Sequence, residues 1–229
     1  MKTKFGRIFA LLALLILFSG CSKYTIRGNI TDKATNLGIE GVQISLKVEG
    51  QEQDRTTLSN KKGDYRIAKD KNKLAFLKAE KENYEPYSLD KISSEQVLNF
   101  WLRPTVEETA RRIVELEKAG SLDTEDEWID LYKTYLHPNY QAEYPLNTFL
   151  EKERAYKTFY NTLTEEPVVV KNVQTFTNWR DDHQHKVYAE VKKVTLELTT
   201  KTGDNTSKIE KEFYFGLAQD YWHLFLVNF

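Results

Sequence analysis

The sequence predicts two folded domains: an all-β antiparallel sandwich, then an α+β domain with helices packed on a curved antiparallel sheet. Three observations carry this prediction. Apolar and polar residues alternate with period two in several segments of 24–103, and no segment of this range has helical spacing. Helical spacing with capping residues then occupies 105–163, and period two returns from 168 onward. Helices followed by a run of antiparallel strands are typical of an α+β domain.

Short strands separated by tight turns make up the predicted sandwich, 24–103. Further strands are expected at 65–67, 74–79 and 97–102. Asn and Gly in the intervening segments tolerate the positive φ that tight turns require. Several short strands at near-regular spacing predict a β-sandwich. The first two strands show the alternation in the apolar residues Tyr24, Ile26, Gly28, Ile30, Val42, Ile44, Leu46 and Val48.

Five short motifs follow one another in this stretch: Gly28-Asn29-Ile30-Thr31-Asp32, Gly38-Ile39-Glu40-Gly41-Val42-Gln43-Ile44, Gly63-Asp64-Tyr65-Arg66-Ile67, Leu77-Lys78-Ala79 and Asn83-Tyr84. Their order resembles that of a known family, the carboxypeptidase regulatory-like (transthyretin-like) β-sandwich. The resemblance implies a non-catalytic accessory domain, often a spacer or an interaction module of an exported protein.

Three helices open the predicted second domain, 104–229. Gly120 is the predicted stop of the first helix and Pro138 the predicted stop of the second. The third helix is expected at about 146–163. Capping boxes predict the first two starts, through the pairs Thr105 with Glu108 and Thr124 with Glu127.

Four strands follow these helices. Two local motifs stand out in this domain: the helix that leads into Tyr135-Leu136-His137-Pro138-Asn139-Tyr140, and the final strand with Asp220-Tyr221-Trp222-His223-Leu224. Together with the order of elements, they resemble the turn and the closing strand of the nuclear transport factor 2-like (cystatin-like) cone fold. The glycine usual before the closing tryptophan is missing here. The resemblance implies a cavity between sheet and helices, which some members use for catalysis. The expected strands cover 168–179, 187–198, 208–217 and 221–229.

Residues 1–20 have the layout of a secretory signal. Basic residues come first, an apolar run covers 8–18, and small residues precede Cys21. The run is too short to span a bilayer, which takes roughly 20 residues. Leu17-Phe18-Ser19-Gly20-Cys21 resembles a bacterial lipobox, which implies lipidation at Cys21. Residues 21–23 would then form a short tether, with the protein anchored in the cell envelope and facing its extracytoplasmic side.

The composition argues against nucleic acid as a partner and against disulfide bonds within the chain. The formal net charge of −1 includes three cations of the signal, so the mature part carries a charge near −4. Such a chain lacks the positive charge that draws proteins to nucleic acid. Cys21 is the one cysteine of the sequence, so no intramolecular disulfide can form.

No motif for catalysis, a cofactor or a metal stands out. His183 and His185 could offer two metal ligands, but zinc needs three or four, so we interpret this stretch as an exposed hairpin. His137 could act as a general base with Asp130 or Glu127, or it could cap a helix. We therefore expect no catalytic residues, no metal and no cofactor.

Aromatic residues are concentrated in the second domain. Where they face a cavity they could stack on a sugar or an apolar ligand, although filling the core is the commoner role of such residues. The candidate ligand-binding residues are Trp128, Tyr132, Tyr135, His137, Tyr188 and Trp222.

The sequence thus predicts a lipid-anchored, non-enzymatic envelope protein. Its sandwich would be a spacer, and its α+β domain would bind a small-molecule or glycan ligand or an envelope protein. Two alternatives stay open: an enzyme of the cone family acting on a small or carbohydrate-like molecule, and a structural subunit of an envelope complex.

Overall fold

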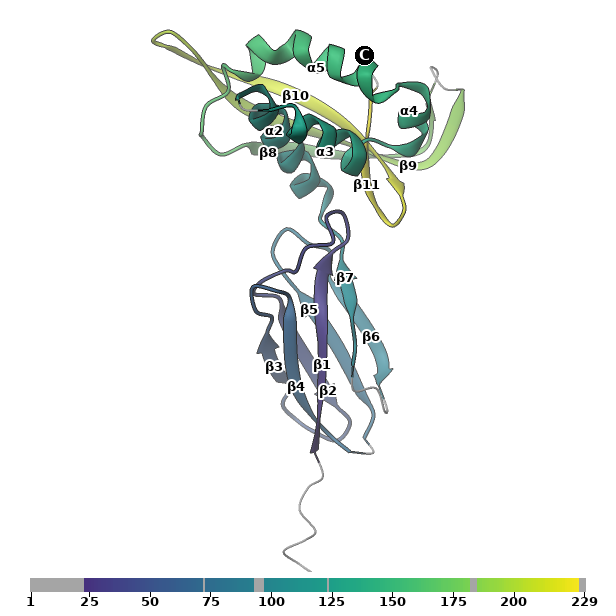
Figure 1. The fold of residues 1–229 in the computed structure, drawn as a ribbon. Helices are drawn as coiled ribbons and strands as arrows, with labels where there is room; N and C mark the ends of the chain where they lie inside the picture. Colours follow the sequence, from purple (N-terminus) through teal and green to yellow (C-terminus); the bar gives the residue numbers. More distant parts are fainter. Residues whose placement is uncertain (1–22, 72, 93–96, 123, 182–184, 227–229) are drawn as a thin grey trace, which may run out of the picture. The chain divides into compact units, whose positions relative to one another are not determined.

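The structure, a computed structural model, describes residues 23–71, 73–92, 97–122, 124–181 and 185–226. Cys21 and the predicted signal peptide lie outside these ranges. No helix within them is both long and apolar enough to cross a membrane. The chain divides into two compact units (Figure 1). The first unit contains the described residues of Met1–Thr31, Leu37–Lys81 and Pro86–Trp101, and the second contains Asp32–Asn36, Glu82–Glu85 and the described residues of Leu102–Phe229.

The first unit is a β-sandwich, as predicted. Its two sheets have the strand orders β4-β1-β7 and β3-β2-β5-β6. The strands alternate between buried and exposed residues, as the buried Tyr65 and Ile67 of β4 illustrate. The strands are β1 (Lys23–Asp32), β2 (Gln43–Val48), β3 (Arg55–Leu58), β4 (Asp64–Asp70), β5 (Ala75–Glu80), β6 (Tyr87–Ile92) and β7 (Phe100–Leu102).

Pairing in this unit is antiparallel from β1 to β4 and through β3, β2, β5 and β6. One bridge, between Arg27 and Val97, is parallel and departs from the predicted all-antiparallel arrangement. Gly63 makes the turn into β4 with φ +80°, and a Cβ there would lie 2.1 Å from the carbonyl oxygen of Ile30. The predicted turn therefore requires glycine for both conformation and space.

The second unit combines four helices with a four-stranded antiparallel sheet of order β11-β10-β9-β8. The helices α2, α3 and α5 lie on one face of this sheet (Figure 1). The helices are α2 (Val106–Leu122), α3 (Asp126–Tyr135), α4 (Pro138–Glu143) and α5 (Leu146–Tyr160). The strands are β8 (Val169–Asp181), β9 (Lys186–Thr202), β10 (Asn205–Ala218) and β11 (Tyr221–Phe225).

The first predicted helix is longer than expected, because Gly120 lies inside α2 and does not end it. A Cβ at this position would meet the indole of Trp128 at 2.5 Å. The glycine therefore allows close approach of α2 and α3, and the prediction of a stop was wrong. Thr105 does cap α2, since its Oγ1 accepts a hydrogen bond of 3.2 Å from the Glu108 backbone N–H.

Pro138 also has a different role from the one predicted. The helix α3 ends at Tyr135, and Pro138 begins the short helix α4, which is not among the three predicted helices. Proline suits this first position because its fixed φ is helical and it lacks an N–H that would have no partner there. His137 is the N-cap, and its Nδ1 accepts a hydrogen bond of 3.2 Å from the Asn139 backbone N–H. The third predicted helix ends at Tyr160, before the predicted 163.

Candidate ligand-binding site

A cavity of about 480 Å³ lies in the second unit, lined by residues of α2, α3, α5, β10 and β11. Its lining includes the buried carboxyl residues Glu117 and Glu153. Two further hollows, of about 360 and 610 Å³, have no buried charged side chain among their lining residues. The first cavity is therefore the candidate site. Its aromatic wall consists of Tyr156, Phe159, Tyr160, Phe213, Tyr214 and Phe225.

Helix periodicity places both glutamates on inward faces. Glu117 follows the buried residues Ile113 and Val114 of α2 by four and three positions. Glu153 follows Phe149 and Leu150 of α5 by the same spacings. Residues three and four apart share a helix face, so each carboxyl occupies a position where an apolar residue is usual.

Glu117 is paired with the one lysine of the cavity lining. The Nζ of Lys211 lies 2.5 Å from Glu117 Oε2. The same ammonium lies over two aromatic rings, 5.2 Å from the centroid of Tyr160 and 4.9 Å from that of Phe213. Both distances are within the range of cation–π attraction. The Lys211 ammonium thus lies between the carboxyl group of Glu117 and the faces of two aromatic rings.

Glu153 has a weaker partner. The Tyr160 hydroxyl donates a hydrogen bond of 2.8 Å to Glu153 Oε2. Burial, and after it the charge of Glu117, raises the pKa of Glu153 to about 7, although Tyr160 and Lys211 act in the opposite direction. Burial also raises the pKa of Tyr160, so its hydroxyl stays protonated and can donate. We call Glu117, Glu153, Tyr160 and Lys211 the cavity cluster.

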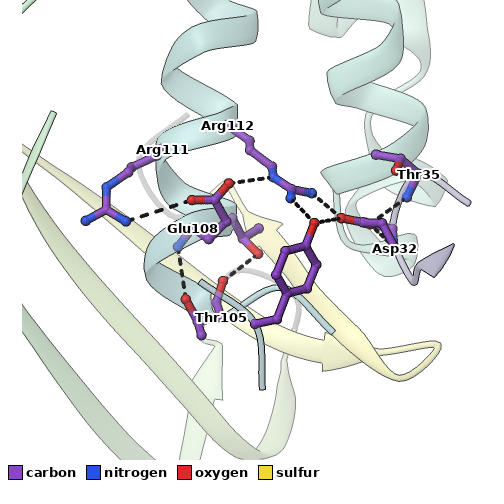
Figure 2. A network of polar contacts seen from close by, with 9 residues as sticks. Asp32, Thr35, Thr105, Glu108, Arg111 and Arg112 are labelled. Atoms are coloured by element: carbon purple, nitrogen blue, oxygen red, sulfur yellow. Dashed lines mark hydrogen bonds and ion pairs between the residues drawn. The ribbon is translucent and has the colours of Figure 1, made fainter. Parts of the chain in front are cut away.

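A second polar cluster of this unit surrounds Arg112 of α2 (Figure 2). Its guanidinium donates to Glu108 at 2.9 Å and to Asp32 at 2.7 Å. It also donates to the Tyr84 hydroxyl at 2.8 Å, and that hydroxyl donates to Asp32 at 2.8 Å. Burial, followed by the charge of Asp32, raises the pKa of Tyr84 to about 12, which keeps the hydroxyl a donor. We call Asp32, Tyr84, Glu108 and Arg112 the Arg112 cluster; none of its residues lines the cavity.

The six candidate ligand-binding residues do not line the cavity either. Trp128, Tyr135 and Trp222 are at least 97% buried. The Trp128 indole donates to the Glu117 carbonyl oxygen at 3.0 Å, and the Trp222 indole donates to Glu85 at 3.2 Å. The Tyr132 hydroxyl donates to the carbonyl oxygens of α4 and of the residue after it. These side chains pack and cap the fold, and ligand binding by them stays a prediction.

His137 is not one of the residues that line the cavity, and its ring packs against other aromatic rings, including that of the lining residue Phe225. Its ring centroid is 5.4 Å from that of Tyr188, 6.0 Å from that of His223 and 4.8 Å from that of Phe225. Burial, followed by the nearby His223, lowers the pKa of His137 to about 4, and burial lowers the pKa of His223 to about 4 as well. Both rings are therefore neutral at pH 7. Tyr188 accepts a hydrogen bond from the Asn139 amide at 2.8 Å.

The described ranges contain no group of three His, Cys, Asp or Glu residues that could hold a metal ion. His183 lies outside the described residues, and His185 is exposed. Asp181, shortly before these histidines, is buried and accepts a hydrogen bond of 2.6 Å from the Tyr140 hydroxyl.

No family model and no curated protein matches the chain. Among solved structures, it is similar to a candidate carbohydrate-binding protein from Bacteroides uniformis, with 14% identity, a TM-score of 0.30 and 77% of this chain covered. The chain spans only 53% of that protein. It is also similar to a DUF3823 family protein from Parabacteroides merdae, with 7% identity, a TM-score of 0.28 and coverage of 89% and 96% of the two chains. A third similar structure is that of a candidate membrane-associated protein of unknown function from Bacteroides fragilis. It has 11% identity and a TM-score of 0.27, and the match covers 84% of this chain and 95% of that protein.

Proposed function

We propose that this chain is a lipid-anchored cell-envelope protein whose second unit binds a small molecule in the cavity, without converting it. The sandwich is its spacer, in keeping with the resemblance to carboxypeptidase regulatory-like domains. The second unit is then a cone of the nuclear transport factor 2-like kind. The single observation that carries the binding role is the cavity. Its volume of about 480 Å³ is typical of ligand pockets, and so is a wall of apolar and aromatic side chains around a few polar groups.

Filling the cavity tests this role. The fluorescent probe 1-aminoanthracene is neutral at pH 7 and apolar enough to enter such a cavity. We expect its fluorescence to rise on binding the wild-type protein. Ile209→Trp places a large ring in the cavity lining and should weaken binding at least tenfold. Val187→Trp, at a position 66% exposed and outside the lining, is the matched control and should bind the probe normally. Equal binding by both variants would contradict the proposal.

Anchoring is tested independently at Cys21. Two or three acyl chains give stable retention in a membrane, because each buried CH₂ contributes about 0.8 kcal/mol. Cys21→Ala removes the acceptor of these chains and should move the protein from the membrane fraction to the soluble extracytoplasmic fraction. Ser22→Ala, next to it, should leave the protein in the membrane fraction. Retention of the Cys21→Ala protein would contradict lipid anchoring.

One observation favours a second candidate function, acid–base catalysis. Glu153 has a pKa of about 7 beside the cavity, and a general acid or base works best when its pKa is close to the operating pH. In this alternative Glu153, and not His137, acts as the general acid or base. Prolonged incubation of a bound compound with the protein, followed by NMR, separates the two functions. Recovery of the unchanged compound supports binding, and conversion that Glu153→Gln abolishes supports catalysis.

A further inference from the structure

The cavity has an excess of negative groups. Its lining contains one ammonium, that of Lys211, which is already paired with Glu117. Glu212 has a partner outside the lining, the Lys193 ammonium at 2.6 Å. Glu153 and the exposed Glu210 have no such cation among the described residues. The carboxyl residues of the lining are Glu117, Glu153, Glu210 and Glu212.

Glu153 is the deepest of the carboxyls that lack a cation. The residue is 4% exposed, and its one recorded hydrogen-bond partner among the described residues is the Tyr160 hydroxyl, which bonds to Oε2. No buried side-chain oxygen or nitrogen in the described ranges lacks a hydrogen-bond partner. Glu153 Oε1 makes no hydrogen bond to the described residues, so it is not one of the fully enclosed side-chain oxygens, and Glu153 lines the cavity. A ligand can therefore reach it.

Lys211 shows how this wall accommodates a positive charge. Its ammonium contacts one carboxylate and lies over the faces of Tyr160 and Phe213. An aromatic face is negative at its centre and attracts cations, most strongly where water is excluded. Tyr160 also bonds to Glu153, so the same aromatic residue connects the occupied carboxyl to the available one. A second ammonium near Glu153 would meet the same kinds of groups.

We propose that the cavity selects an organic cation, namely a protonated amine whose body is apolar or aromatic. The ammonium pairs with Glu153, and the body packs on the apolar wall of Leu131, Phe159 and Phe213. This inference rests on the proposed binding function and names its ligand class.

The other charge types fit this cavity less well. An anion would enter beside carboxyl groups that already outnumber the ammonium of Lys211, and like charges in a partly dry site repel one another strongly. A neutral molecule would leave Glu153 without a directly paired cation, because the nearby Lys211 is paired with Glu117. A cation gives Glu153 an opposite charge and also favours its ionised form, so pairing and deprotonation reinforce each other.

Three probes with the same body and different head groups test this preference. They are 4-phenylbutylamine, 4-phenylbutanol and 4-phenylbutyrate, titrated into the wild-type protein by calorimetry at pH 7.5. We expect the amine to bind at least tenfold more tightly than the alcohol, and the carboxylate to bind most weakly. Because this comparison uses the wild-type protein, it does not depend on whether a variant folds.

Glu153→Gln supplies the second arm of the test, after circular dichroism has verified that it folds. The substitution should weaken binding of the amine at least tenfold and change binding of the alcohol by less than threefold. Glu151→Gln, on the exposed face of the same helix, is the matched control and should change neither. Alcohol or carboxylate binding equal to or tighter than amine binding would overturn the ligand class. Failure of all three probes together with 1-aminoanthracene would overturn the binding function itself.

Discussion

The two polar clusters of the second unit use similar residues for different ends. In the Arg112 cluster, one guanidinium bonds to two carboxylates and a hydroxyl, and Asp32 accepts from both Arg112 and Tyr84. In the cavity cluster, Lys211 is paired with Glu117, but Glu153 has only a neutral donor and borders about 480 Å³ of space. A buried charge with a full set of partners holds a fold together. A buried carboxyl with an open oxygen is available to a ligand.

The largest expected loss of stability comes from a substitution that breaks the Arg112 cluster. Arg112→Met keeps the apolar stem but leaves Asp32, whose side chain is 4% exposed, without its cation. Removing one partner of a buried pair costs about 3–5 kcal/mol of unfolding free energy. Urea denaturation followed by circular dichroism measures this loss. Arg111→Met, one position earlier with a 3.9 Å ion pair to Glu108 and a side chain 34% exposed, should cost less than about 1 kcal/mol. Equal losses of unfolding free energy in the two variants would contradict the stabilising role assigned to the Arg112 cluster.

The cavity cluster should instead respond to pH. The pKa of Glu153 is raised from 4.5 to about 7 in the folded protein, so between these pH values the folded state binds more protons than the unfolded state. The free energy of unfolding contributed by this group therefore falls as pH rises through this window, by about 3 kcal/mol in all. Glu153→Gln removes this contribution. The difference in unfolding free energy between variant and wild type should grow in favour of the variant from pH 4.5 to 7. A constant difference would show that the pKa of Glu153 is ordinary.

A smaller effect is expected where α2 and α3 meet beside Glu117. Gly120→Ala introduces a Cβ 2.5 Å from the Trp128 ring, and overpacking of this kind costs about 1–3 kcal/mol. Trp128→Phe in the same chain offers a smaller ring. Thermal unfolding of the two single variants and the double variant forms a cycle. Gly120→Ala should cost less in the Trp128→Phe protein than alone, and additive losses would contradict the close contact.

The smallest expected effect lies within the cavity cluster. Tyr160→Phe deletes the hydroxyl that stabilises ionised Glu153, so the pKa of Glu153 should rise by about one unit above its wild-type value. Carbon-13 NMR of the glutamate carboxyls during a pH titration measures the pKa of Glu153 in both proteins. Tyr156→Phe, an exposed residue of the same helix and cavity lining, should leave this pKa unchanged. A lower pKa in Tyr160→Phe would contradict the assigned donor.

Much of the fold could be predicted from the sequence because its elements have local causes. Period-two alternation marked strands such as β2 and β10, and the capping threonine at 105 marked the start of α2. Gly120 and Pro138 were misjudged because their roles depend on neighbours. The former makes room for an indole from another helix, and the latter begins α4.

The candidate site was less accessible to sequence analysis. The six candidate residues were chosen for aromatic character, yet aromatic residues fill cores as readily as they line cavities. Glu117 and Glu153 were overlooked because charged residues in amphipathic helices normally face solvent. The available signal was their spacing, since each lies three and four positions after a pair of apolar core residues. The sequence near each glutamate does not tell which of the two has a cation partner, because that partner, Lys211, comes from a distant strand.

Proton release on ligand binding tests the central claim most directly. At pH 7, Glu153 with a pKa of about 7 is close to half protonated, and an ammonium bound beside it displaces that proton. Calorimetry of 4-phenylbutylamine binding in two buffers of different ionisation enthalpy counts the protons released. The predicted result is about half a proton per amine bound by the wild-type protein and none by Glu153→Gln. Amine binding without proton release by the wild-type protein would contradict the role assigned to Glu153.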